Sequence, residues 1–159
     1  EQHTITHRDY HADNLFWLQG RSGYRAVGMI DYQDALWGDA AYDLASLLEA
    51  ARRDVSSATV AQCYAYYVQE AAEDTASFAA RYAVIAAQRN AKIIGIFARL
   101  CIRDGKAHYL EYLPRVWGHF ARDLEHPLLA PLRDFVNMHV PTDWRGTFEP
   151  NLAVGGIVP

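Results

Sequence analysis

One stretch decides the fold of this chain: His7-Arg8-Asp9-Tyr10-His11-Ala12-Asp13-Asn14-Leu15. It is complemented by a second stretch that also carries acidic residues, Met29-Ile30-Asp31-Tyr32-Gln33-Asp34-Ala35. Asp9 comes five residues before Asn14, and Asp31 follows a short apolar run. Two separate segments therefore supply carboxylate and amide oxygens.

The segment between these two stretches has the pattern of a β-hairpin. Phe16-Trp17-Leu18 is followed by a turn through Gly20-Arg21-Ser22-Gly23 and then by Ala26-Val27-Gly28-Met29-Ile30. Apolar runs on both sides of a glycine-containing turn predict two antiparallel strands. Because a hairpin returns the chain on itself, we expect Asn14 and Asp31 to lie close together.

The chemistry of these side chains suits phosphoryl transfer. That reaction needs an acceptor that orients the attacking hydroxyl and oxygen ligands for the metal that accompanies the phosphates. Carboxylate and amide oxygens are ligands that Mg²⁺ prefers. An Asp, an Asn five residues later and a second Asp after an apolar run are typical of a catalytic loop followed by a metal-binding segment.

The motif His7-x-Asp9-x4-Asn14 with Ile30-Asp31 resembles the aminoglycoside phosphotransferase and choline kinase superfamily, which shares the protein-kinase fold. An Asp43-Leu44 pair that opens the next helix is the third mark of that superfamily. A closer similarity is to bacterial kinases that phosphorylate the anomeric hydroxyl of N-acetylmuramate and N-acetylglucosamine. It covers roughly residues 3–140 and is carried by His7-Arg8-Asp9, Ile30-Asp31-Tyr32-Gln33-Asp34-Ala35, Tyr42-Asp43-Leu44-Ala45-Ser46-Leu47-Leu48, Ala51-Arg52-Arg53-Asp54-Val55 and Gly95-Ile96-Phe97-Ala98-Arg99-Leu100.

The resemblance implies an ATP-dependent kinase that uses Mg²⁺ and acts on a small molecule, with an amino sugar of cell-wall recycling as the expected substrate. It also implies a role for each matching residue. These are Asp9 as catalytic base, Asn14 and Asp31 as ligands of the metal and the ATP phosphates, His7 and Asp43 as structural support of the loop, and Gln33 and Asp34 as neighbours of the sugar. His11 and Asp13 are interpreted as solvated loop residues.

Kinases of this fold also carry an N-terminal lobe with a glycine-rich loop, a strand lysine and a helix glutamate. None of these appears in the sequence, and the catalytic motif begins at residue 7. We therefore expect this chain to be a C-terminal lobe whose partner is the missing N-terminal lobe. By itself it is expected to bind ATP poorly and to turn over little.

The expected fold is mainly α with a small β-hairpin, the C-terminal lobe of a protein-kinase-like α+β fold. Residues 1–140 form the lobe, with a catalytic loop at 7–15, a metal-binding segment at 29–35 and a helical bundle at 39–138, and residues 141–159 form a tail. Residues 1–6 read as extended and 32–38 as irregular. Apolar periodicity predicts helices at about 39–53 (with Asp39 as N-cap), 56–72, 75–103, 106–113, from Pro114 to before His126, and 128–138.

The amino-acid composition further restricts the class of protein to which the chain can belong. A chain of 159 residues that is 51% hydrophobic and 21% charged is globular. The net charge of −4 argues against nucleic-acid binding, and no run of about 18 apolar residues predicts a membrane span. Cys63 and Cys101 lie on predicted apolar helix faces, so we expect both to be buried and reduced, and the protein to be cytoplasmic.

Other functions remain open at this point. His7, Asp9, His11 and Asp13 could share a metal in a metal-dependent hydrolase, but that interpretation leaves Asn14 and the Ile30-Asp31 pair unexplained. A non-catalytic kinase-like module that binds a partner is a third class, and the presence of both Asp9 and Asp31 argues against it. Within the kinases, an aminoglycoside or a choline-type substrate is the alternative to an amino sugar.

Overall fold

The computed structural model describes residues 3–148. It falls into two units, Glu1–Ala86 and Ala87–Pro159, which are described in turn. The predicted fold class is confirmed, because helices dominate and the strands form two small antiparallel sheets. The predicted boundary at residue 140 stays a prediction. None of the helices within the described part of the chain is both long and apolar enough to cross a bilayer.

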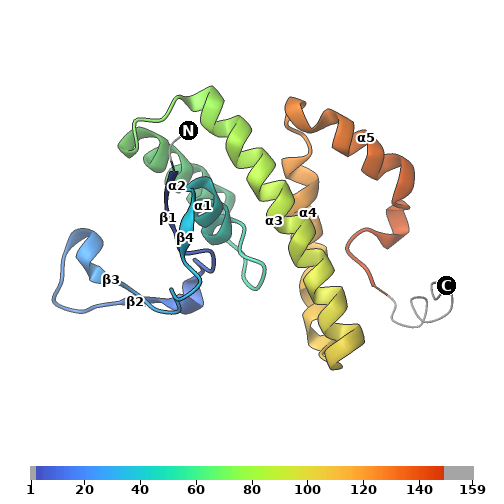
Figure 1. The fold of residues 1–159 in the computed structure, drawn as a ribbon, viewed down its shortest axis with the longest axis horizontal. Helices are drawn as coiled ribbons and strands as arrows, with labels where there is room; N and C mark the ends of the chain where they lie inside the picture. The colour runs from blue at the N-terminus through green and yellow to red at the C-terminus, as the bar shows by residue number, and fades with distance from the viewer. Residues whose placement is uncertain (1–2, 149–159) are drawn as a thin grey trace. The chain divides into compact units, whose positions relative to one another are not determined.

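A two-stranded sheet opens the first unit (Figure 1). β1 (His3–Thr6) pairs antiparallel with β4 (Leu36–Asp39), so that Thr6 faces Leu36 and His3 faces Asp39. The extended structure expected at residues 1–6 is confirmed for 3–6, and residues 1 and 2 lie outside the described residues. The expectation that residues 32–38 are irregular is wrong from Leu36 on, because this short strand is held by pairing with a segment more than 30 residues away.

The predicted hairpin is confirmed. β2 (Leu15–Trp17) pairs antiparallel with β3 (Val27–Met29), and Leu15 faces Met29. The turn between them contains the 3-10 helix η2 (Gly23–Ala26) and ends with a bond from Leu18 N–H to Ala26 O at 2.7 Å. This pairing returns the chain from the end of the catalytic loop to the metal-binding segment.

The helix α1 (Ala41–Leu48) is shorter than the predicted span of 39–53. Asp39 belongs to β4, although its carboxylate still accepts the N–H of Ala41 at 2.9 Å. At the other end, Glu49 leaves helical geometry. Arg53, which would have continued the helix, instead forms an ion pair with Asp13 at 2.8 Å. The helix therefore ends at Leu48, and the segment after it contacts the catalytic loop.

The helix α2 (Ser57–Glu70) begins as predicted, with the Ser56 hydroxyl accepting the N–H of Thr59 at 3.1 Å. Two of its tyrosines pack against the core, because the rings of Tyr64 and Tyr67 lie 5.5 and 5.3 Å from that of Phe78, which is completely buried, whereas Tyr66 is exposed. Phe78 lies on α3 (Thr75–Asp104), whose predicted span is confirmed.

Arg81 joins the separate elements of this unit. Its guanidinium donates to Asp39 at 2.9 Å and to both oxygens of Glu73, at 2.9 and 3.2 Å. These hydrogen bonds, led by those to Glu73, raise the pKa of Arg81 above its ordinary value. The end of β4 is thereby fixed to the turn before α3.

The two cysteines differ in burial. Both are free thiols, and Cys101 is buried as expected. Cys63 is only half-buried, so the expectation of two buried thiols is wrong for it. The reason is that α2 packs through its aromatic side chains and buries no residue completely.

In the second unit, α3 ends at Asp104 and is followed by Gly105, whose φ of 65° is typical of the residue after a helix. The predicted α-helix at 106–113 is the 3-10 helix η3 (Ala107–Tyr112). Its geometry places residues three apart on one side, and the rings of Tyr109 and Tyr112 lie 5.2 and 6.0 Å from that of Phe97. The helices that follow are α4 (Leu113–Asp123), η4 (Pro127–Leu129), α5 (Ala130–His139) and η5 (Thr142–Trp144).

Pro114 lies in the first turn of α4, so the helix predicted to start there is present. Asn90 donates to the buried carboxylate of Asp123 at 2.9 Å. After α5, Gly146 approaches Pro114 so closely that a Cβ would lie 3.0 Å from the proline Cα. Within the predicted tail, Gly146 is therefore packed against the start of α4, and residues 149–159 lie outside the described residues.

Candidate active site

The catalytic loop is anchored to α1 by one carboxylate. Asp43 accepts the backbone N–H of His7 at 2.6 Å and that of Arg8 at 2.9 Å. Asp43 lies in the first turn of α1, where the helix dipole also favours a negative charge. Arg8 is held at a φ of 72°, an uncommon conformation for a residue with a side chain. The support role assigned to Asp43 stays a prediction, and these two bonds are its physical basis.

His7 connects the loop to the metal-binding segment. Its Nε2 donates to the carbonyl of Ile30 at 2.9 Å, and its Nδ1 accepts the N–H of Asp9 at 3.3 Å. Both bonds are satisfied by one neutral tautomer of a buried ring. His7 is therefore engaged on both nitrogens, which leaves it no lone pair for the metal of a hydrolase.

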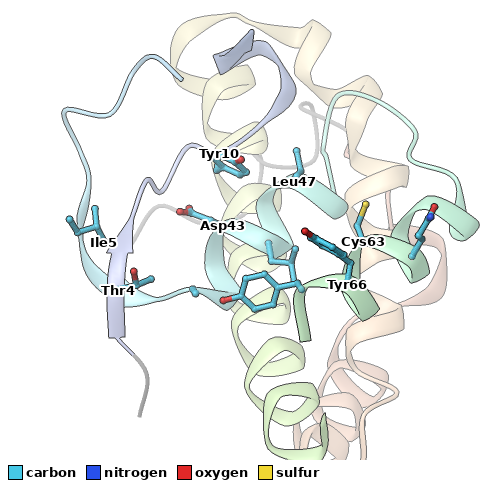
Figure 2. Close-up of a pocket in the computed structure, with 11 residues that line it drawn as sticks. Thr4, Ile5, Tyr10, Asp43, Leu47, Cys63 and Tyr66 are labelled. Atoms are coloured by element: carbon cyan, nitrogen blue, oxygen red, sulfur yellow. The ribbon is translucent and has the colours of Figure 1, made fainter. Parts of the chain in front are cut away.

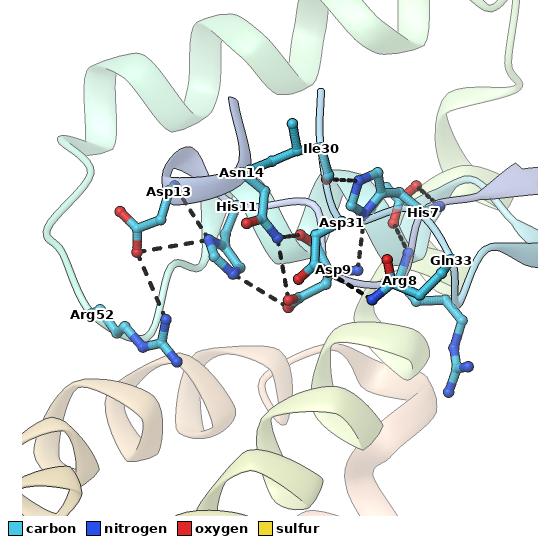
Figure 3. A network of polar contacts seen from close by, with 11 residues as sticks. His7, Arg8, Asp9, His11, Asp13, Asn14, Ile30, Asp31, Gln33 and Arg52 are labelled. Carbon is cyan, nitrogen blue, oxygen red and sulfur yellow. Dashed lines mark hydrogen bonds and ion pairs between the residues drawn. The ribbon is translucent and has the colours of Figure 1, made fainter. Parts of the chain in front are cut away.

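Asp9, Asn14 and Asp31 meet at the end of the hairpin (Figure 3). The side-chain amide of Asn14 donates to the backbone carbonyl of Asp9 at 3.0 Å and to its Oδ2 at 3.3 Å. The N–H of Ile30 donates to the carbonyl of Asn14 at 3.1 Å, which brings the following residue, Asp31, beside the loop. Asp31 itself has a φ of 67°. The proximity expected from the hairpin is thus present.

The donor set suits Mg²⁺ that is shared with phosphates. The nitrogen of the Asn14 side chain is committed to Asp9, so Oδ1 is the atom that Asn14 can offer. Asp31 is exposed and adds a carboxylate. Mg²⁺ is commonly held by one or two protein oxygens together with waters and substrate phosphates. Between residues 3 and 148, no three His, Cys, Asp or Glu side chains form a group that could enclose a metal.

The two residues expected near a sugar are placed differently. The Gln33 side chain donates to Asp31 at 2.6 Å and so belongs to the cluster. Asp34 is linked to the loop through its backbone, because its carbonyl accepts from the Arg8 guanidinium at 3.4 Å. Their roles toward a substrate stay predictions.

Sequence reasoning missed His11 and Asp13, which were interpreted as solvated. His11 Nε2 lies 3.3 Å from Oδ1 of Asp9 (Figure 3). Asp13 forms an ion pair with Arg53 at 2.8 Å. Arg52 lies 3.7 Å from the other oxygen of Asp13. A signal was present in the sequence, because His-x-Asp occurs twice, at 7–9 and at 11–13.

A pocket of about 720 Å³ lies behind the loop in the same unit (Figure 2). Asp43 and Tyr10 line it together with side chains of β1, α1 and α2, among them Ile5, Leu47, Cys63 and Tyr66. Burial raises the pKa of Tyr10, and the negative charge of Asp43 raises it further. Asp9, Asn14 and Asp31 do not line this pocket, so the cluster of oxygens opens elsewhere.

The chain is similar in sequence to known proteins over most of its length. The phosphotransferase enzyme family matches residues 1–82, which contain the whole cluster. The chain is 43% identical over 140 residues to an N-acetylmuramate/N-acetylglucosamine kinase of Caulobacter vibrioides, covering 87% of this chain and 39% of that protein. Proteins of the same name match from Neisseria meningitidis, at 35% identity over 79% of the chain and 39% of the relative, and from Pseudomonas putida, at 32% over 83% and 40%.

The chain thus spans about 40% of the length of the curated relatives it matches. The family match covers more than half of the 159 residues and includes both motif stretches. The resemblance noted from the motifs is therefore confirmed, and the chain belongs to the phosphotransferase enzyme family.

Proposed function

We propose that the full gene product that contains this chain is a cytoplasmic, ATP- and Mg²⁺-dependent kinase. It phosphorylates the anomeric hydroxyl of N-acetylmuramate or N-acetylglucosamine in cell-wall recycling. The observation that carries the proposal is the convergence of Asp9, Asn14 and Asp31 on one site through the loop and the hairpin. The names of the relatives support the choice of an amino sugar.

In the proposed mechanism, each residue acts through position and charge. Asp9 orients the sugar hydroxyl and takes its proton. Asn14, through Oδ1, and Asp31 hold the metal. Mg²⁺, when bound with ATP, supplies the positive charge that offsets the charge of the phosphates.

The remaining side chains keep this geometry. Asp43 fixes the backbone of the loop through two N–H groups, and His7 ties the loop to Ile30. Gln33, which donates to Asp31, is the side chain best situated to contact both the metal ligand and a sugar. The gain in rate comes from holding the reacting groups in line and from neutralising charge.

The test measures ADP release by the full gene product with Mg²⁺ and ATP against N-acetylmuramate, N-acetylglucosamine, kanamycin and choline. Turnover on the N-acetyl sugars is the expected result, and Asp9→Asn should lower kcat by roughly 10²–10⁴-fold because the proton acceptor is lost. Asp134→Asn makes the same chemical change on α5 at an exposed position and should leave kcat unchanged.

Turnover on kanamycin or choline alone would keep the kinase and discard the amino sugar. An Asp9→Asn variant with a near-normal rate would discard the role of Asp9. ADP release with none of the four compounds would favour a non-catalytic binding module over an enzyme of this kind.

A further inference from the structure

Two histidines of the catalytic loop are held in the same way (Figure 3). Nδ1 of His7 accepts the N–H of Asp9 at 3.3 Å, and Nδ1 of His11 accepts the N–H of Asp13 at the same distance. A neutral imidazole whose Nδ1 accepts must carry its proton on Nε2. The two rings therefore present an Nε2–H donor in a fixed direction.

The targets of these two donors differ. Nε2 of His7 donates to a backbone carbonyl, that of Ile30, which is a structural bond. Nε2 of His11 lies 3.3 Å from Oδ1 of Asp9. The other oxygen of Asp9, Oδ2, accepts from the Asn14 amide at 3.3 Å. The Asp9 carboxylate is thus contacted at both oxygens.

These contacts matter because little else holds Asp9. Its side chain is 56% exposed, whereas that of His11 is 21% exposed. An exposed carboxylate turns freely about its side-chain bonds, and each contact restricts that rotation. The more buried ring is the rigid partner of the pair.

His11 is itself supported from a second segment. Asp13, whose N–H holds the ring, has one carboxylate oxygen 2.8 Å from Arg53 and the other 3.7 Å from Arg52. That other oxygen also lies 3.8 Å from His11 Nδ1. A continuous set of contacts therefore runs from Arg52 and Arg53, in the segment after α1, through Asp13 and His11 to Asp9.

We propose that His11 is a positioning residue for Asp9: its Nε2–H, oriented by Asp13 and Arg53, fixes the plane of the carboxylate that receives the substrate hydroxyl. The proposal rests on the proposed function, because positioning has an effect on rate only if Asp9 acts on a hydroxyl. It assigns a role to the second half of the His-x-Asp repeat.

Another histidine of the chain, His126, can be compared with His11. His126 also accepts, through Nδ1, the N–H two residues ahead at 3.3 Å, in η4. Across residues 3–148, no carboxylate contacts its ring. The local geometry alone is therefore structural, and what distinguishes His11 is the carboxylate that its outer nitrogen faces.

The kinetic test uses the full gene product with Mg²⁺, ATP and N-acetylmuramate. His11→Ala is expected to lower kcat by roughly ten- to hundredfold, the effect of a small misplacement of a reacting group. KM for ATP should stay within about twofold, because the metal ligands are untouched. His11→Gln, which keeps a side-chain N–H donor, should recover part of the loss, and His126→Ala should match the wild type.

A pairwise test addresses the support. Arg53→Ala should lower kcat in the wild type but cause no further loss in His11→Ala, since the contacts act in series. Unchanged kcat in His11→Ala would overturn the proposal, and so would equal losses in the Ala and Gln variants, which would make His11 merely structural.

A spectroscopic test separates this proposal from the proposed function. Ring ¹⁵N–¹H correlation spectra should show His11 as the Nε2–H tautomer, and Asp9→Asn should shift its Nε2 resonance. An Nδ1–H tautomer, or no shift, would overturn the positioning contact even in a protein that phosphorylates sugars. If the spectra are as expected but no sugar is phosphorylated, the proposed function and the rate effect fail together while the contact stands.

Discussion

A single side chain, Asp43, orders a loop that lies more than 30 residues earlier in the chain. Its two oxygens each accept one backbone N–H, from His7 and from Arg8. Hydrogen bonds to a charged acceptor are stronger than neutral ones, and two of them on adjacent amides fix both the position and the direction of the loop. Asp43 thereby holds the backbone that leads directly into Asp9.

We expect Asp43→Asn to destabilise the fold by about 1.5–3 kcal/mol, because the neutral amide has only one acceptor oxygen for the two N–H groups. Urea denaturation measures this free energy of unfolding. Glu70→Gln, at an exposed position at the end of α2, makes the same change of charge and should shift it by less than about 0.5 kcal/mol. Equal shifts in the two variants would mean that Asp43 contributes only its charge.

The spacing of Asp9, Asn14 and Asp31 was sufficient to predict that they meet, because a hairpin brings the residues at its two ends side by side. The contacts of His11 were not predictable in the same way. The direction of its ring depends on the short 3-10 helix η1 (Ala12–Asn14), and Arg53 reaches Asp13 only because α1 ends early. The repeated His-x-Asp marks His11 and Asp13 in the sequence, but it indicates neither the direction of the ring nor the end of α1.

At the scale of elements, β4 shows why sequence reasoning failed at 32–38. Leu36 and Trp37 are both exposed, so the strand buries no apolar face that a period could reveal. Its position is set by close approach to β1. A Cβ on Gly38 would lie 2.5 Å from the hydroxyl oxygen of Thr6, which is itself buried.

Gly38→Ala should therefore destabilise the fold by about 1–3 kcal/mol, the usual effect of overpacking. Gly95→Ala is the matched control, because a Cβ there meets nothing within 4 Å and a helical glycine gains about 0.5–1 kcal/mol on becoming alanine. Thermal unfolding of both variants gives the comparison. Adding Thr6→Ala to Gly38→Ala should recover part of the loss, and an additive loss would argue against the contact.

The aromatic contacts of α2 predict a loss of stability at high pH. Burial raises the pKa of Tyr64 and of Tyr67, and the negative charges of Glu73 and Asp39 raise that of Tyr67 further. A group whose pKa is higher in the folded state stabilises the fold fully below its unfolded pKa of about 10, and this contribution is lost as the pH rises through the folded value.

Urea denaturation between about pH 8 and pH 11 should accordingly show a falling free energy of unfolding, while tyrosinate absorbance at the same pH values reports which rings ionise late. The double variant Tyr64→Phe, Tyr67→Phe should show a shallower decline. A decline as steep as that of the wild type would place its origin in other residues.

At the scale of the molecule, long periodic helices were the most predictable part. The full span of α3 followed from its apolar residues, whereas the short α1 and the 3-10 helix η3 depend on contacts that no local window contains. The described residues provide oxygen ligands for a metal. The sequence contains no glycine-rich loop that could hold the phosphates.

We therefore expect the 159-residue chain to bind Mg²⁺-ATP at least about tenfold more weakly than the full gene product, since even one missing charge-assisted bond to phosphate is worth that much. Isothermal titration calorimetry on both proteins measures the difference. Asp31→Asn in the full product should weaken binding as well. Robust turnover by the short chain would contradict this expectation.

The bonds that shape the catalytic loop have a consequence for how the protein is made. They join residues that are 23, 35 and 36 positions apart in the chain. During translation the loop leaves the ribosome first, and its partners in Ile30 and α1 follow only after dozens of further codons. A nascent chain arrested before Asp43 would already carry Asp9, Asn14 and Ile30, but it would lack the carboxylate that accepts the N–H groups of His7 and Arg8.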